Sequence, residues 1–291
     1  MAKQPEHPSK PDLDTLDPRF IEFIQKSQFL VVDPHSSSRN ALRRLCLDLG
    51  AKSPNVNAVD NLGDAHEMIS KLRPQFLIVE YEMGGGRCGM DLIHVQRKWY
   101  EKDSERVFLL ITSNQSPAIL SHAEEEEVDS ILPKPFTAAK FRDQLLAAIA
   151  PKFNPTPYLT AIQDGKTALV RKNFPDAIAA FRKARKLDPK PTAACFYEGV
   201  ANRKSEKPED AAKCFERGLT FDPKNFRCLE GLYEISMERK DPAKSYALTR
   251  LMYAEHPYTP RRIPELVKLS IANKKFKDVL DYYKFFVQME A

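Results

Sequence analysis

Hydrophobic and polar positions follow two different patterns along this chain, and the change falls near residue 155. In the first half, short apolar runs of strand length are each followed by a longer stretch in which apolar residues recur every three or four positions. The apolar runs are Phe29–Val32, Val56–Val59, Phe76–Val79, Val107–Ile111 and Ser130–Leu132. Strands that alternate with helices in this way predict a doubly wound, five-stranded parallel α/β sheet.

Two segments precede the first predicted strand. Residues 1–16 are rich in proline and polar residues and nearly free of large apolar ones, so they predict a disordered tail. Within residues 17–25, Phe20, Phe23 and Ile24 recur at helical spacing, which predicts a short helix that packs on the domain that follows.

A proline-rich break at residues 154–157 separates the two patterns, because each proline disfavours helical geometry in the residue before it. We therefore predict an α/β domain at residues 17–152, a linker at 153–157 and an all-helical domain at 158–291. Four pairs of identical residues in the last domain are 34 positions apart: Gly165 and Gly199, Ala177 and Ala211, Phe181 and Phe215, Pro189 and Pro223. Self-similarity at one period predicts stacked helical hairpins, that is, a solenoid.

Composition places the chain of 291 residues among globular proteins, with 42% hydrophobic and 29% charged residues. Its longest apolar runs are far shorter than the ~20 residues that cross a bilayer. The N-terminus lacks a signal-peptide pattern, so we expect a cytoplasmic protein without a membrane segment. The five cysteines never form a Cys-x-x-Cys spacing, which predicts buried free thiols rather than disulfides or a zinc site.

The net charge of +5 is unevenly distributed. Residues 1–157 carry 19 Lys and Arg against 22 Asp and Glu, whereas residues 158–291 carry 26 against 18. A basic half can bind nucleic acid, but here the basic residues alternate with acidic ones at helical spacing and no base-stacking motif accompanies them. The basic residues are therefore best explained as parts of solvated helix faces. A nucleic-acid-binding regulator is the alternative.

Polar residues stand at the predicted carboxyl ends of the strands, the edge at which open α/β sheets bind ligands. They are Asp33, Glu80, Thr112 and Lys134. The segments that contain them read FLVVDPHSSSR from Phe29, FLIVEYEM from Phe76, ITS from Ile111 and KPF from Lys134. Together these segments resemble the receiver domain of bacterial response regulators over about residues 27–150, with all five strands in order.

The resemblance implies a site that has lost its phosphorylation chemistry. In receiver domains, two acidic residues after the first strand and one aspartate after the third hold magnesium, and that aspartate accepts a phosphoryl group. The matching positions here are Asp33, Pro34 and Glu80. Pro34 has no side-chain oxygen for a metal that demands near-octahedral oxygen ligands, and the carboxylate of Glu80 lies one methylene further from its backbone. The resemblance thus implies a pseudo-receiver with no catalytic residue, metal or cofactor.

Other family positions are partly retained. Thr112 matches the hydroxyl that contacts the phosphoryl group, Lys134 matches the lysine that pairs with it, and the Lys134-Pro135 bond matches one that is usually cis. Ile131 stands where many members have a switching aromatic residue. Two hypotheses for Glu80 remain open: its carboxylate imitates the phosphorylated state by reaching Lys134 and Thr112, or it reflects drift in a domain that is kept for its surface.

The helical half resembles the tetratricopeptide repeat (TPR), which has a glycine in its first helix, alanine and phenylalanine in its second, and Asp-Pro in the closing turn. The resemblance implies about four repeats, at residues 158–191, 192–225, 226–259 and 260–291. The third is degenerate, because Ser245 and Thr249 replace the alanine and phenylalanine and only Pro257 is kept. The fourth retains Phe276, Val279, Tyr283 and Phe286.

A stack of such hairpins exposes a groove lined by the first helices, the usual site for a peptide or helix. The predicted groove residues are Ile162, Lys166, Leu169, Val170, Phe196, Val200, Arg203, Lys204, Glu230, Glu234 and Met237. An apolar floor with charged ends favours an amphipathic segment as the ligand. For any single position, ordinary packing between repeats is the competing interpretation.

No Ser/His/Asp, Cys/His or paired-carboxylate pattern typical of catalysis occurs in the chain. We therefore predict a non-enzymatic signalling adaptor, in which a pseudo-receiver is coupled to a TPR domain that holds a protein partner, while a second protein could bind the receiver surface. The alternatives are a functional phosphorelay regulator with an altered site and the nucleic-acid-binding regulator.

Overall fold

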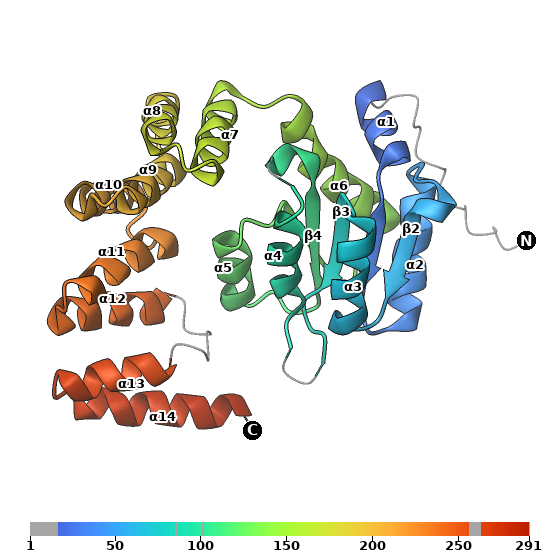
Figure 1. Ribbon diagram of the computed structural model, residues 1–291. Helices are drawn as coiled ribbons and strands as arrows, with labels where there is room; N and C mark the ends of the chain where they lie inside the picture. The colour runs from blue at the N-terminus through green and yellow to red at the C-terminus, as the bar shows by residue number, and fades with distance from the viewer. Residues whose placement is uncertain (1–16, 85–86, 101, 256–262, 291) are drawn as a thin grey trace, which may run out of the picture. The chain divides into compact units, whose positions relative to one another are not determined.

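A computed structural model describes residues 17–84, 87–100, 102–255 and 263–290 (Figure 1). The predicted tail and Pro257 lie outside these residues, and the side chain of Phe286 is not described. The chain divides into two compact units. The α/β unit comprises the residues up to 115 together with 126–155, and the helical unit comprises 116–125 together with the residues from 156 onward.

The α/β unit contains a five-stranded sheet in which all neighbouring strands are parallel, in the order β2-β1-β3-β4-β5. Its strands are β1 (Phe29–Val32), β2 (Val56–Val59), β3 (Phe76–Glu80), β4 (Val107–Thr112) and β5 (Ser130–Pro133). This is the strand order of the flavodoxin-like doubly wound fold. The predicted fold class is therefore confirmed, and each strand matches its predicted apolar run or extends it by one residue.

Helices on both faces of the sheet explain why β1, β3 and β4 are apolar and buried along nearly their whole length. The helices that flank the sheet are α1 (Pro18–Lys26), α2 (Ser36–Asp48), α3 (Leu62–Leu72), α4 (Leu92–Arg97) and α6 (Ala138–Phe153). One hydrophobic cluster joins α1, α2 and α6 to one face, while α3 packs beside α4 (Figure 1). At the centre of that cluster the rings of Phe29 and Phe76 stack with centroids 4.2 Å apart.

Helix α1 packs on the unit as its spacing predicts. Ile24 is buried, and the rings of Phe20 and Phe23 lie 5.3 Å from that of Phe153 at the end of α6. In the sequence, α5 (Pro117–Glu125) connects β4 to β5.

The rest of the helical unit consists of consecutive helix pairs, each helix packing on the next. These helices are α7 (Pro157–Val170), α8 (Phe174–Arg185), α9 (Thr192–Lys204), α10 (Pro208–Phe221), α11 (Phe226–Glu238), α12 (Pro242–Glu255), α13 (Ile263–Ala272) and α14 (Phe276–Glu290). The second helices of the pairs begin at residues 174, 208, 242 and 276, which are 34 residues apart. A helical repeat therefore extends over all four described pairs.

The turn within each pair repeats as closely as the helices do. Lys172, Glu206, Lys240 and Lys274 each have a left-handed backbone, with φ between 55° and 60°, and they also recur every 34 residues. Such a conformation is uncommon for residues other than glycine, so its recurrence marks one backbone plan. The third pair, whose sequence signature is weak, keeps this plan.

Polar contacts replace aromatic packing inside the third pair. Ser236 and Ser245 share a buried hydrogen bond of 2.7 Å, and the hydroxyl of Thr249 donates to the carbonyl of Ser245 at 2.6 Å. Because these hydroxyls have partners, their burial is tolerated where the first two pairs bury alanine and phenylalanine. The third pair thus keeps the fold of the repeat although it has lost the signature residues.

Glycine permits the close approach of the two helices in the first two pairs. A Cβ atom at Gly165 would lie 2.4 Å from the ring of Phe181, and one at Gly199 would lie 2.4 Å from the ring of Phe215. No side chain fits at these distances, so the glycines and the rings are mutually dependent. Among the described helices, none is long and apolar enough to span a membrane.

Gly199→Ala should destabilise the helical unit by about 1–3 kcal/mol, because the added methyl group overlaps the Phe215 ring. Urea unfolding of the full chain, followed by circular dichroism, measures the loss. The urea transition followed by tryptophan fluorescence should stay at the wild-type midpoint, because the only tryptophan, Trp99, lies in the α/β unit.

The control is Lys204→Ala, an exposed change on the same helix, which should alter the unfolding free energy by less than about 0.5 kcal/mol. Combining Gly199→Ala with Phe215→Leu should recover part of the loss. Wild-type stability for Gly199→Ala alone would contradict the close packing.

Candidate functional site

The carboxyl edge of the sheet brings together the residues that the sequence singles out. Asp33 directly follows β1, Glu80 ends β3, Thr112 ends β4 and Lys134 directly follows β5. Val32 pairs with Val79, and Glu80 pairs with Ile111, so the ends of adjacent strands lie at one level. The parallel register therefore brings four residues that are distant in sequence close together at one edge of the sheet.

Lys134 lies between two buried carboxylates. Its Nζ atom is 2.8 Å from Oδ2 of Asp33 and 2.5 Å from Oε2 of Glu80. Asp33 and Glu80 are almost completely buried, whereas the Lys134 side chain is 22% exposed. One ammonium group thus compensates two negative charges, which leaves a net charge of −1 on the three side chains.

Other protein groups occupy the remaining carboxylate oxygens. The main-chain N–H of His35 donates to Oδ1 of Asp33 at 2.8 Å, and the hydroxyl of Ser38 donates to Oδ2 at 2.6 Å. The main-chain N–H of Glu82 donates to Oε1 of Glu80 at 3.3 Å. Each of the four carboxylate oxygens therefore accepts at least one hydrogen bond from the protein itself.

Ser38 and Arg39 belong to this site although the sequence did not single them out. The Arg39 guanidinium donates to the carbonyls of Asp33 and Pro34 at 2.7 and 3.0 Å and lies 3.5 Å from the Asp60 carboxylate. Both residues stand in the first turn of α2, directly after the β1 edge. That position was the available signal, because the first turn of a helix after a parallel strand faces the strand ends.

Opposing effects set the protonation of the buried groups. Burial alone would raise the pKa of Asp33, but hydrogen bonds from Lys134, Ser38 and the His35 main chain lower it below its ordinary value. Partial burial alone would lower the pKa of Lys134, but hydrogen bonds to Asp33 and Glu80 raise it above its ordinary value. Asp33 and Lys134 are therefore both charged across the neutral range.

These residues do not fit a magnesium ion. Magnesium in a receiver site needs carboxylate oxygens, and the oxygens of Asp33 and Glu80 already accept hydrogen bonds from Lys134, Ser38 and main-chain groups. Pro34 contributes only a main-chain carbonyl, which accepts from Arg39. The missing ligand at Pro34 and the pairing of Lys134 with both carboxylates therefore both disfavour a bound magnesium ion.

Thr112 is buried but does not join the ion triad. Its hydroxyl donates to the carbonyl of Asn114 and accepts from the N–H of Asn114, both at 3.0 Å. Of the two contacts that the phosphate-imitation hypothesis requires of Glu80, the structure contains the one to Lys134, and the hydroxyl of Thr112 is bonded elsewhere. The Lys134-Pro135 bond is cis, as the resemblance implied.

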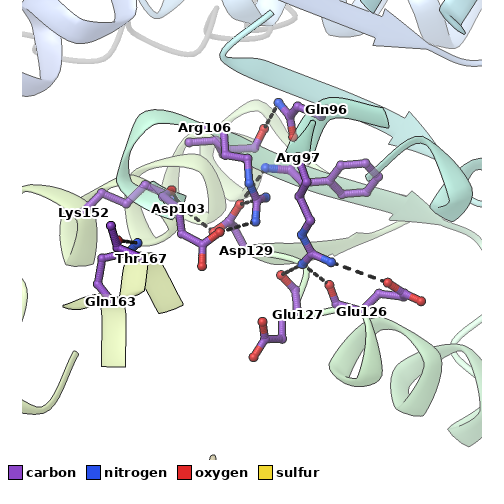
Figure 2. A network of polar contacts seen from close by, with 12 residues as sticks. Gln96, Arg97, Asp103, Arg106, Glu126, Glu127, Asp129, Lys152, Gln163 and Thr167 are labelled. Atoms are coloured by element: carbon purple, nitrogen blue, oxygen red, sulfur yellow. Dashed lines mark hydrogen bonds and ion pairs between the residues drawn. The ribbon is translucent and has the colours of Figure 1, made fainter. Parts of the chain in front are cut away.

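A second charged network lies at the opposite, amino edge of the sheet (Figure 2). Arg106, which is buried, lies 2.5 Å from Asp103 and 3.8 Å from Asp129. Lys152 of α6 lies 2.6 Å from Asp129. These pairs connect α6 to the segments just before β4 and β5, so the network holds the sheet edge rather than forming a ligand site.

One predicted groove residue in the helical unit belongs to the hydrophobic core, and three others pack against it while partly exposed. Ile162 is buried in the cluster between α7, α8 and α9, and Leu169 packs against it. Phe196 and Val200 pack against the cluster between α10 and α11. Ile162 is therefore accounted for by packing between repeats, whereas Leu169, Phe196 and Val200 pack between repeats and remain partly exposed.

The other predicted groove residues keep polar or exposed side chains. Val170 and Met237 are exposed, Arg203 forms an ion pair with Glu234, and Lys166 lies 4.8 Å from the centroid of the Tyr197 ring. Lys204 is exposed, and Glu230 is partly exposed.

Arg227, in the first turn of α11, also faces aromatic rings of α9 although no sequence pattern indicates it. Its guanidinium lies 4.0 Å from the Phe196 ring centroid and 4.8 Å from that of Tyr197. Lys166 and Arg227 thus place two cations on aromatic rings of α9. Because the residues come from three different helices, no local sequence pattern predicts this arrangement.

The chain matches no protein-family model and no curated protein sequence. Solved structures that are similar include the signal receiver domain of a modulated diguanylate cyclase from Desulfovibrio desulfuricans G20, with 21% identity over 45% of this chain and 98% of that one, at a TM-score of 0.38. Another is the receiver domain of a putative Luxo repressor protein from Vibrio parahaemolyticus, with 16% identity over 44% and 93% of the chains, at a TM-score of 0.38.

A third is the receiver domain of the response regulator PhyR from Erythrobacter litoralis, with 18% identity over 45% of this chain and 95% of that one, at a TM-score of 0.37. Each of these similarities covers less than half of this chain. The strand order β2-β1-β3-β4-β5 is by itself that of the flavodoxin-like doubly wound fold.

Lys134→Met should destabilise the α/β unit by about 3–5 kcal/mol, because two buried carboxylates would lose their counter-charge. Trp99 fluorescence during urea unfolding of the full chain measures this unit. The matched control adds Asp33→Asn and Glu80→Gln to Lys134→Met, which removes all three charges and should recover most of the loss. A cost below about 1 kcal/mol for Lys134→Met alone would show that the carboxylates do not depend on it.

The stabilising effect of the triad should have two pH limits. Because the folded pKa of Asp33 is lowered, its contribution is present above the ordinary value of 3.8 and is lost as the pH falls through the folded pKa. Because the folded pKa of Lys134 is raised, its contribution is complete below 10.5 and is lost as the pH rises through the folded pKa. The unfolding free energy is to be measured from pH 3 to 11 for wild type and for the triply neutral variant. The difference between the two proteins should be constant between these limits and should shrink outside them. A difference that is constant from pH 3 to 11 would contradict a stabilising role for the charges of Asp33 and Lys134.

Proposed function

We propose that this chain is a non-enzymatic signalling adaptor, in which a pseudo-receiver is joined to a TPR-type helical unit that binds a protein partner. The observation that carries the proposal is the ammonium of Lys134, held between Asp33 and Glu80 at 2.8 and 2.5 Å. In this arrangement the protein supplies the positive charge that a metal would supply in a phosphorylatable site.

Phosphoryl transfer requires a nucleophile that can approach the phosphorus in line and a metal that neutralises the transferred group. The Glu80 carboxylate is held by Lys134 on one oxygen and by the main chain of Glu82 on the other. Pro34 cannot replace the missing ligand. These features support a site that keeps one arrangement irrespective of phosphate.

The engagement of Thr112 bears on the two hypotheses for Glu80. A phosphoryl group in a receiver site recruits both the lysine and the hydroxyl, but here Lys134 alone contacts Glu80 while Thr112 bonds Asn114. This favours a locked site over a close copy of the phosphorylated state. The adaptor would then present one constant surface to its partners.

The TPR assignment is supported by the period of 34 residues, the left-handed turns and the glycine–phenylalanine contacts of the first two pairs. The first helices of the pairs carry exposed apolar side chains at Val170 and Met237 beside charged residues, a combination suited to an amphipathic protein segment. The partner is therefore proposed to be a protein.

Magnesium with beryllofluoride, a phosphoryl analogue, tests the loss of receiver chemistry. Titration of the isotope-labelled full chain should leave the amide resonances of Glu80, Thr112 and Lys134 unchanged, because Pro34 has no side-chain ligand for the metal and the Asp33 and Glu80 carboxylates are paired with Lys134. The matched positive control is the variant with Pro34→Asp and Glu80→Asp, which restores the carboxylates of the receiver pattern and should show saturable shifts.

Saturable shifts in the wild-type chain that require both reagents would overturn the pseudo-receiver assignment and favour a functional regulator with an altered site. Incorporation of phosphate from acetyl phosphate, lost in Glu80→Gln, would lead to the same conclusion.

A further inference from the structure

The last described helix, α14, exposes three large apolar side chains on one face. Phe276, Leu280 and Tyr283 are 61%, 61% and 64% exposed, and their spacing of four and three residues places them in one stripe along the helix. Isolated exposed apolar residues are ordinary, but a contiguous stripe of this kind marks an interaction surface.

The repeat indicates what kind of element covers this stripe. Tyr283 occupies the repeat position of Phe181, Phe215 and Thr249, which are 0%, 1% and 4% exposed. Phe181 and Phe215 are covered from two sides, by a glycine in the first helix of their own pair and by Tyr197 or Gly231 in the first helix of the next pair. Leu280 occupies the position of Ile178, which is partly buried, and of Ala212 and Tyr246, which are buried. In each earlier pair the second helix packs against the first helix of the next pair, as α8 packs against α9. The stripe on α14 therefore has the features of a surface for one more helix.

The contact between α8 and α9 supplies a chemical template for that helix. The ring of Phe181 stacks on the ring of Tyr197 with centroids 5.4 Å apart, and the adjacent Arg182 lies 2.9 Å from the buried carboxylate of Glu198. An aromatic residue followed by a cation on one helix thus meets an aromatic residue followed by an acid on the next.

The same aromatic–cation pair recurs on α14. Tyr283 and Lys284 stand three repeats after Phe181 and Arg182, and both are exposed. Lys277, also exposed, adds a second positive charge two turns before Lys284 along the same edge of the stripe, and the exposed Asp281 lies on the outer side of that edge. The stripe is therefore apolar along its centre, and two lysines border it on one edge.

We propose that this face of α14 binds an amphipathic helix of a partner protein that carries a large apolar residue followed by an acidic one. The apolar residue packs on Leu280 and Tyr283, and the acid pairs with Lys284. A second copy of α14 fits less well, because antiparallel pairing of two such stripes brings Lys277 of one copy beside Lys284 of the other. The proposal does not depend on the groove of the first helices.

The probe is a peptide with the sequence of residues 191–205, held helical by a lactam bridge and labelled with fluorescein. It carries the Tyr197-Glu198 pair that α8 binds within the chain. Fluorescence anisotropy with the full chain should show saturable binding. Tyr283→Ala and Leu280→Ala should each weaken it at least roughly tenfold, as expected for an anchoring contact.

Charge exchange tests the polar half of the proposal. Lys284→Glu should weaken binding of the wild-type peptide several-fold, and a peptide with Glu198→Lys should regain affinity for that variant while losing affinity for the wild-type chain. The control is Lys213→Glu, the same charge change at an exposed position of α10, which should leave both affinities unchanged. Circular dichroism checks that each variant is folded.

Absence of saturable binding, or equal affinity for wild type and the Tyr283 and Leu280 variants, would overturn the proposal. So would a dimer of the full chain in sedimentation velocity that Leu280→Glu dissociates, because the face would then be covered by a second copy.

Discussion

Two buried carboxylates share one partly buried ammonium group at the carboxyl edge of the sheet, and the candidate site depends on this pairing. Burying a charge is costly unless another charge and hydrogen bonds compensate it. Asp33 and Glu80 meet this requirement only because Lys134, Ser38 and main-chain N–H groups converge on them. That convergence needs the strand ends at one level, so the register of the parallel sheet and the ion triad support each other.

The triad also makes the site sensitive to the loss of any one of its three members. A buried ion group is a weak source of net stability, but removal of one member leaves an uncompensated charge. The site is therefore constrained by its own electrostatics. Pro34, which offers no charged side chain, keeps the count at two carboxylates, and one lysine is then able to bridge both.

The helical unit depends on a different constraint, the repeated distance between helices. Glycine at two positions lets phenylalanine rings fill the space between helices, and in the third pair hydroxyl groups with hydrogen-bond partners replace the rings. The left-handed turn residues keep the same period through this change of chemistry. Each pair covers the face of the one before it, so the stability of one pair depends on its neighbour.

The sequence alone determined the fold class, the strands and the period of the helical half, because these follow from local apolar spacing and identical residues at one interval. It also indicated Asp33, Glu80, Thr112 and Lys134, because strand ends can be located from strand patterns. Tertiary structure alone decided which partners these residues take. The hydroxyl of Thr112 turns to Asn114, Ser38 and Arg39 enter the site from α2, and Ile162 and Phe196 pack between helices. Contacts between residues far apart in the chain depend on distances of tenths of an ångström, and hydrophobic spacing along a sequence does not encode such distances.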